Sequence, residues 1–172
     1  MIGPPVRLFV AVRPPPEVIE VVAALPRPER HGVRWTRPDQ WHVTLRFLGD
    51  VARSEPVAAA LAAGLAGAPA VEVALGPTTE RLGRAVLMVP ATGLDGLAAR
   101  VLDATRDGVP VADDAFGFHG HLTLARWPRG VAGWAVGEPV AATWTAHEVE
   151  LVRSELGGGP ARHEVVDTFP LG

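Results

Sequence analysis

The sequence has 172 residues, of which 48% are hydrophobic and 20% are charged, and its formal net charge is −3. This composition is typical of a globular protein, and the length suffices for one core or two small lobes. Cysteine, lysine and tyrosine are absent, which excludes disulfides, thiolate or phenolic nucleophiles and a lysine-adenylate intermediate. The small negative charge argues against non-specific coating of nucleic acid, but it is compatible with recognition of a single phosphate.

No segment has the pattern of a membrane span or a signal peptide. The longest uncharged run, 56–71, is rich in alanine and glycine and is shorter than the ~20 strongly apolar residues of a membrane span. The apolar stretch VRLFVAV near the N-terminus is only as long as a strand and precedes Arg-Pro-Pro-Pro. We therefore expect a soluble, cytoplasmic protein that does not associate with membranes.

Hydrophobic periodicity predicts a mixed order of strands and helices. Helical spacing is found from Val18 to Leu25, from Val57 to Leu65 with Ser54 as N-cap, and from Leu94 to Thr105. Strands are predicted at 6–12, 33–36, 41–48, 70–75, 85–89, 121–127, 141–153 and 162–168, the last two joined as a hairpin by a turn over Gly157–Pro160. This order favours an α+β fold with mainly antiparallel sheets and helices packed outside.

Two H-x-T-L motifs, HVTL at 42–45 and HLTL at 121–124, carry the candidate catalytic residues. In a strand, residues i and i+2 share a face, so His42 projects with Thr44 and His121 with Thr123. Two imidazoles facing one phosphate can act as general base and general acid, while the hydroxyls donate to its non-bridging oxygens. A single H-x-T is usually structural, but two copies, each followed within two residues by arginine, predict a paired site that needs no metal and no cofactor.

Other residues near the motifs are weaker candidates. By simple alternation Arg46 shares the face of His42 and could bind phosphate. Phe47 could stack on a base, although FLG after a strand more often packs in a core. His119 and His121 have the spacing of two metal ligands, but no third ligand is evident. The remaining histidines are interpreted as surface or hairpin residues: His31, His147 and His163.

The chain resembles the 2H phosphoesterase superfamily, and within it the bacterial and archaeal RNA 2′,3′-cyclic phosphodiesterases, formerly called 2′-5′ RNA ligases. Four segments that together span almost the whole chain carry the resemblance: RLFVAVRPP, VRWTRPDQWHVTLRFLGDV, GFHGHLTLARWPRG and LVRSELGGGPARHEVVDTFPL. The resemblance implies one domain over 1–172 made of two pseudo-symmetric lobes, with an active-site cleft between their sheets. It also implies hydrolysis of RNA 2′,3′-cyclic phosphate ends to 2′-phosphates, with weak ATP-independent 2′-5′ ligation in reverse.

The resemblance further assigns roles to single residues. It makes His121 the base toward water and His42 the acid toward the 3′ oxygen, although the residues themselves leave this direction open. Arg126 matches the phosphate-binding arginine of H-x-T-L-A-R, but alternation turns it away from His121, so a bulge or a strand end must redirect it. The sequence departs from the family where His119-Gly120 replaces Arg-Pro, and where His163 replaces tyrosine.

Two alternatives to RNA-end hydrolysis remain at this stage. One is a 2H enzyme acting on a small cyclic nucleotide such as ADP-ribose 1″,2″-cyclic phosphate. The other is a non-catalytic binder of phosphorylated RNA ends, although a binder would not need two titratable imidazoles. In each case we expect RNA ends, short oligonucleotides or nucleotides as partners, no obligatory protein partner, and a monomer.

Overall fold

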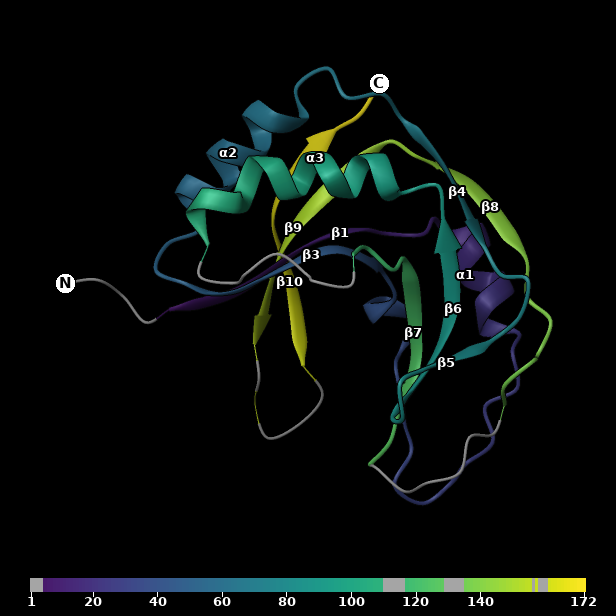
Figure 1. Cartoon of the computed structure of the whole chain (residues 1–172). Coiled ribbons are helices and arrows are strands. Elements are labelled where there is room, and N and C mark those ends of the chain that lie inside the picture. The colour runs from purple at the N-terminus through teal and green to yellow at the C-terminus, as the bar shows by residue number, and fades with distance from the viewer. Residues whose placement is uncertain (1–4, 110–116, 129–134, 156, 158–160) are drawn as a thin grey trace.

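The computed structural model describes residues 5–109, 117–128, 135–155, 157 and 161–172. Figure 1 shows their arrangement. The strands are β1 (Val6–Val12), β2 (Arg34–Trp35), β3 (Val43–Val51), β4 (Val71–Leu75), β5 (Glu80–Leu82), β6 (Val86–Thr92), β7 (His121–Arg126), β8 (Ala142–Ala146), β9 (Glu148–Glu155) and β10 (Arg162–Pro170). The helices are α1 (Pro16–Ala23), α2 (Glu55–Leu65) and α3 (Asp95–Thr105), with short 3₁₀ turns η1 (Pro38–Gln40) and η2 (Arg106–Gly108). None of the helices in these described ranges is long and apolar enough to span a membrane.

The strands form one curled antiparallel sheet, as Figure 1 shows. Its order is β10-β9-β1-β3-β7-β6-β4-β8, with β2 also paired to β7 and β5 to β6. The two halves of the sheet meet where β3 pairs with β7 at Val43 and Leu122. The prediction of an α+β fold with a mainly antiparallel sheet is therefore confirmed.

The main hydrophobic core lies on one face of this sheet. Alternate residues of β1, Leu8, Val10 and Val12, are fully buried in it, together with Leu61 of α2 and Val101 of α3. The residues between them, Phe9 and Ala11, instead form a small separate cluster with Val152 of β9. Helices α2 and α3 therefore cover one face of β1 and β3, and the opposite face is left for polar groups.

Three sequence predictions about the elements need correction. The single strand predicted over 141–153 is wrong, because the chain breaks at His147 into β8, which pairs with β4, and β9, which pairs with β1 and β10. Strand β3 does not end at Leu48 but continues to Val51, with Leu48 as the extra residue of a register shift and Gly49 beside it at φ 72°. Ser54 precedes α2 as predicted, but its side chain makes no capping hydrogen bond. The predicted turn over Gly157–Pro160 lies outside the described residues except for Gly157, while β9 and β10 do pair antiparallel.

Candidate active site

The two H-x-T-L motifs lie side by side where the halves of the sheet meet. Val43 and Leu122, each directly after a motif histidine, are paired antiparallel, and both are 0% exposed within the core. Continuing this register places His42 across from Thr123 and Thr44 across from His121. The four polar side chains therefore share the face away from the core. Diagonal neighbours in such a pair stand about 7–8 Å apart, which leaves room for a phosphate between the imidazoles.

Each imidazole is held by the same kind of contact, between its Nδ1 atom and the backbone carbonyl two residues earlier. The Nδ1 atom of His42 lies 2.7 Å from the carbonyl oxygen of Gln40, and that of His121 lies 2.8 Å from the carbonyl oxygen of His119. Because a carbonyl oxygen can only accept, each Nδ1 carries the hydrogen and donates it. In the neutral rings both Nε2 atoms are thus unprotonated, and each can take up a proton and later deliver it.

Side chains that precede the first motif fix the backbone of the second. The Thr36 hydroxyl lies 2.6 and 2.9 Å from the carbonyl oxygens of Thr123 and Leu124. It also accepts a 2.9 Å hydrogen bond from the indole Nε1 of Trp41, which is 1% exposed. The residue before His42 thus braces the strand that carries His121. Sequence reasoning missed this link, because no local pattern relates positions that are 87 residues apart.

Strand β7 contains the irregularity that the assignment of Arg126 required. Its pairing with β6 shifts register between Leu87 and Met88, which leaves Leu124 as an extra residue on β7. Leu124 and the residue after it are both buried, and Arg126 is exposed. The bulge therefore returns Arg126 to the face that carries His121 and Thr123.

Strand β3 has a bulge at the same motif position, but there the bulge contradicts the prediction made for Arg46. The pairing of β3 with β1 skips Leu45, so Arg46 turns toward the helices. Arg46 is 9% exposed, and its Nη1 donates to the carbonyl oxygen of Leu102 (3.1 Å) and the hydroxyl of Thr105 (2.8 Å) in α3. The prediction that Arg46 shares the face of His42 is therefore wrong, because simple alternation does not hold across a bulge.

The same bulge exposes Phe47. This residue pairs with Phe9, whose side chain lies on the His42 face, and its own side chain is 40% exposed. The guanidinium carbon of Arg7 lies 4.9 Å from the centroid of the Phe47 ring. Phe47 is thus not a core residue, and an exposed aromatic beside an arginine can take part in base stacking.

His42 packs in a cluster of three rings. Phe9 stacks against it with a centroid distance of 4.7 Å and an interplanar angle of 28°. His163 from β10 meets it edge-on at 5.3 Å and 75°. His163 is half-buried in the β9–β10 pair, in line with its interpretation as a surface or hairpin residue, but that interpretation missed its contact with His42. His31 and His147 are exposed, as predicted.

The surroundings of His42 favour its neutral form. The pKa of His42 is lowered from 6.5 to about 4, mainly by burial and also by the nearby charges of His163, Arg13 and His121, against the raising effect of the hydrogen bond to Gln40. Desolvation and like charge both disfavour an imidazolium. At neutral pH the Nε2 of His42 in the free protein is therefore a proton acceptor.

Gly120, which stands where the family has proline, meets a tight constraint. A Cβ at this position would lie 2.4 Å from the carbonyl oxygen of Ala91, too close for any side chain. The Gly120 carbonyl in turn accepts a 2.9 Å hydrogen bond from the Ala91 amide. The glycine thus allows the start of β7 to approach β6 closely just before His121.

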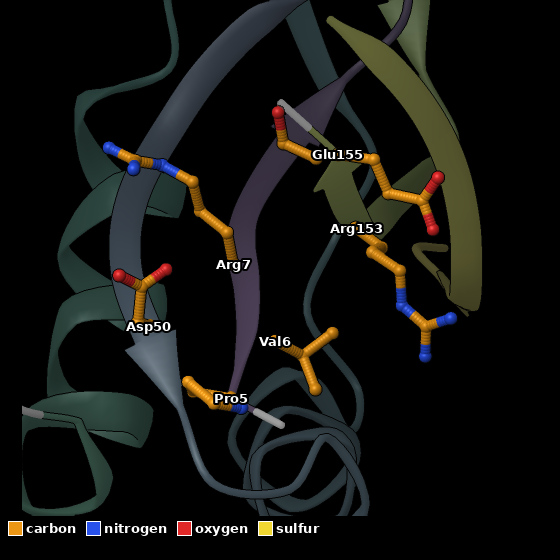
Figure 2. A pocket seen from close by; sticks show the side chains of 7 residues that line it. Pro5, Val6, Arg7, Asp50, Arg153 and Glu155 are labelled. Carbon is orange, nitrogen blue, oxygen red and sulfur yellow. The ribbon is translucent and has the colours of Figure 1, made fainter. Parts of the chain in front are cut away.

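Two other features of the described residues do not form a second centre. No group of three histidine, aspartate, glutamate or cysteine side chains in these parts of the chain is arranged to hold a metal ion. A surface hollow of roughly 700 Å³ lies at the far end of β1, away from His42. Figure 2 shows that Arg7 and Asp50 there point to one side of the strand and Val6 and Arg153 to the other, so its charged groups do not converge.

Comparison with known proteins agrees with this arrangement. The family model of LigT-like phosphoesterases matches residues 10–77, which include the first motif. The protein TT0787 of Thermus thermophilus is 30% identical, with 96% of this chain and 97% of that chain covered and a TM-score of 0.77. No curated protein sequence matches the chain.

Two structures of a second bacterial protein are similar over nearly their whole length. E. coli LigT complexed with 3′-AMP is 29% identical, with 97% of this chain and 98% of that chain covered and a TM-score of 0.74. E. coli LigT complexed with phosphate is 25% identical, with 98% and 99% covered and a TM-score of 0.74. The chain belongs to the LigT-like phosphoesterases of the 2H phosphoesterase superfamily, whose chemistry is the hydrolysis or joining of phosphodiesters.

Proposed function

We propose that this protein hydrolyses 2′,3′-cyclic phosphates at RNA 3′ ends to 2′-phosphates, without a metal ion. The observation that carries the proposal is the matched pair of imidazoles. His42 and His121 lie on one face of adjacent strands, and each has its Nδ1 hydrogen engaged by a backbone carbonyl. In this arrangement one Nε2 removes a proton from water while the other delivers one to the leaving oxygen.

We assign the base to His42 and the acid to His121, the reverse of the roles that the resemblance implies. A pKa of about 4 leaves His42 neutral at pH 7, ready to accept a proton from water. As an acid, His42 would first have to gain a proton, which the anionic phosphate would have to stabilise. The hydrolysis then balances: water adds to phosphorus, its proton goes to His42, and the 3′ oxygen leaves with the proton of His121.

The remaining site residues bind the phosphate and the nucleotide. The hydroxyls of Thr44 and Thr123 share the face of the imidazoles and donate to the non-bridging oxygens. Arg126 is exposed on the same face, and its planar guanidinium suits a phosphate. Phe47 provides an exposed ring for a base further along the strand.

A nucleotide substrate is supported by the relatives. E. coli LigT has been crystallised with 3′-AMP and with phosphate, ligands that together represent the nucleoside and phosphoryl parts of an RNA end. The net charge of −3 fits the recognition of an end better than the binding of a long duplex. Because the cyclic ester stores the strain, the same residues would support slow 2′-5′ joining in reverse without ATP.

The test is incubation with an RNA oligomer that ends in a 2′,3′-cyclic phosphate, followed by isomer-specific mapping of the product. We expect a 2′-phosphate, unchanged turnover in EDTA, and a loss of about 10²–10⁴-fold in each of His42→Ala and His121→Ala. His147→Ala, which removes an exposed histidine, is the matched control. Full activity in either motif variant, or loss of activity on chelation, would contradict the mechanism.

The same assay separates the alternatives. Faster turnover of ADP-ribose 1″,2″-cyclic phosphate than of the oligomer would indicate a small-nucleotide enzyme with the same chemistry. Phosphate-dependent binding of the oligomer without turnover of either compound would indicate a binder of RNA ends. Neither result would change the geometry of the histidine pair, so each revises only the substrate or the activity.

A further inference from the structure

A third histidine takes part in the surroundings of the motif pair. The ring of His163 lies edge-on to His42 at 5.3 Å and edge-on to Phe9 at 5.1 Å. Phe9 and His42 are themselves stacked, so three rings contact one another pairwise: one from β1, one from the residue before β3 and one from β10. His163 is partly exposed and, among the described residues, its nitrogens have no hydrogen-bond partner, in contrast to the Nδ1 of His42.

We propose that His163 is a positioning residue of this active site, which holds the His42 ring against Phe9 and disfavours a proton on it by placing a second proton-binding ring in contact with it. The catalytic meaning of this arrangement rests on the proposed function, but the arrangement itself does not. His163 is assigned no direct step on the substrate.

Gln40 forms hydrogen bonds with both segments that bring His42 and His163 together. The backbone carbonyl of Gln40 holds the Nδ1 of His42, and its side-chain Nε2 donates a 2.6 Å hydrogen bond to the carbonyl oxygen of Ala161. Ala161 directly precedes β10, and His163 is then fixed by pairing with Ser154 of β9. Gln40 thus links the segment that contains His42 to the strand that contains His163, so the fold itself holds the two rings in contact.

Charged and titratable groups of neighbouring elements act on this pair of rings. Arg13, the residue after β1, donates from Nε and Nη2 to the carboxylate of Glu150 at 3.1–3.2 Å, and Asp39 of η1 is bound by Arg37 at 2.9–3.0 Å. His121 on β7 is the remaining titratable group that acts on His42. Because the carboxylates of Glu150 and Asp39 are each paired with an arginine, neither is a free counter-ion for a second proton on the ring pair.

The consequence is sequential protonation. Burial and the charge of Arg13 lower the pKa of His163, while Asp39 raises it, and a proton on His163 then opposes one on His42. Two imidazoles in contact titrate as a coupled pair, so the second proton binds more weakly than the first. The contact with His163 therefore keeps His42 a base to lower pH than burial alone would allow.

The test is an NMR titration of the Cε1 proton of His42 in the wild type and in His163→Phe. Phenylalanine preserves the ring contact and removes the charge, so we expect the titration midpoint of His42 to move up from about 4. His147→Phe, at an exposed position outside the cluster, is the matched control and should leave the midpoint unchanged. The acid limb of kcat/KM should move in the same direction, with a loss at neutral pH well below the ~10²-fold lower bound for a catalytic histidine.

An unchanged titration midpoint of His42 in His163→Phe would overturn the proposal. A loss of kcat/KM by the same factor at every pH would overturn it as well, because it would show that His163 acts only through packing. The titration needs no turnover, so it remains decisive even if the protein proves inactive on cyclic phosphates. Should the phenylalanine variant fail to fold, His163→Gln carries the same test, because it also removes the charge.

Discussion

The role of His42 can be decided by the pH dependence of the residual kcat/KM of His121→Ala, in which His42 is the motif histidine that remains, because kcat/KM reports the protonation of the free enzyme. With a pKa of about 4, His42 holds a proton in only about one molecule in 10³ at pH 7. If His42 had to donate its proton, the free His121→Ala enzyme would be about 10³-fold below its maximal kcat/KM at pH 7, a deficit of about 4 kcal/mol. If it accepts a proton, kcat/KM suffers no such penalty at neutral pH.

We therefore expect the residual kcat/KM of His121→Ala on a short oligomer with a 2′,3′-cyclic phosphate end, measured from about pH 3.5 to 9, to be sustained above about pH 5 and to fall on the acid side near a pH of about 4. The profile of kcat should show its acid limb at higher pH, because the bound phosphate stabilises the imidazolium. Circular dichroism at each pH separates this limb from acid unfolding. A kcat/KM of His121→Ala that rises steadily as the pH falls from about 8 to about 5 would refute the assignment of His42 as base.

Three further outcomes follow from the contacts of single residues. Arg126→Ala should weaken inhibition by phosphate about 10–100-fold, as expected for one lost charge-assisted hydrogen bond of about 1.5–3 kcal/mol. Arg46→Ala should instead lower the melting temperature and leave inhibition by phosphate unchanged, because Arg46 is bonded to α3. Equal inhibition of the two variants by phosphate would contradict this division. Gly120→Ala should destabilise the fold by about 1–3 kcal/mol in urea unfolding, because its Cβ would meet the Ala91 carbonyl, and an unaffected midpoint would show that β6 and β7 can part there. Finally, between pH 6.5 and about 4 the unfolded chain binds more protons at His42 than the folded protein does. The free energy of unfolding should therefore fall by up to about 3 kcal/mol as the solution is acidified through this range, and it should fall less in His42→Phe.

The sequence was sufficient to predict the motif pair and the class of fold. Alternation within HVTL and HLTL correctly placed each histidine and its threonine opposite two buried residues, because strand periodicity holds over four residues. It could not predict which strands would be neighbours, nor that β10 would bring His163 to His42, since such pairings depend on the topology of the whole sheet. The break at His147 was also missed, because the alternating segment of β8 is followed at once by a second segment with the apolar residues of a strand.

The errors near the motifs have a common physical origin. In both H-x-T-L motifs the leucine is the extra residue of a bulge, so the residue after it turns to the core face and the next one returns to the histidine face. In β3 this buries Arg46 and exposes Phe47, and in β7 it buries Ala125 and exposes Arg126.

Phe47 and Arg126 are therefore equivalent positions in the two halves, and only their chemistry differs. A site with one imidazole from each half can use an aromatic side chain on one flank and a guanidinium on the other without any change of backbone. Because a bulge changes which residues reach the site while the motif strands stay paired, residues after such a motif have to be counted with the extra residue included. Counted in this way, the sequence alone would have favoured Arg126 and Phe47 over Arg46.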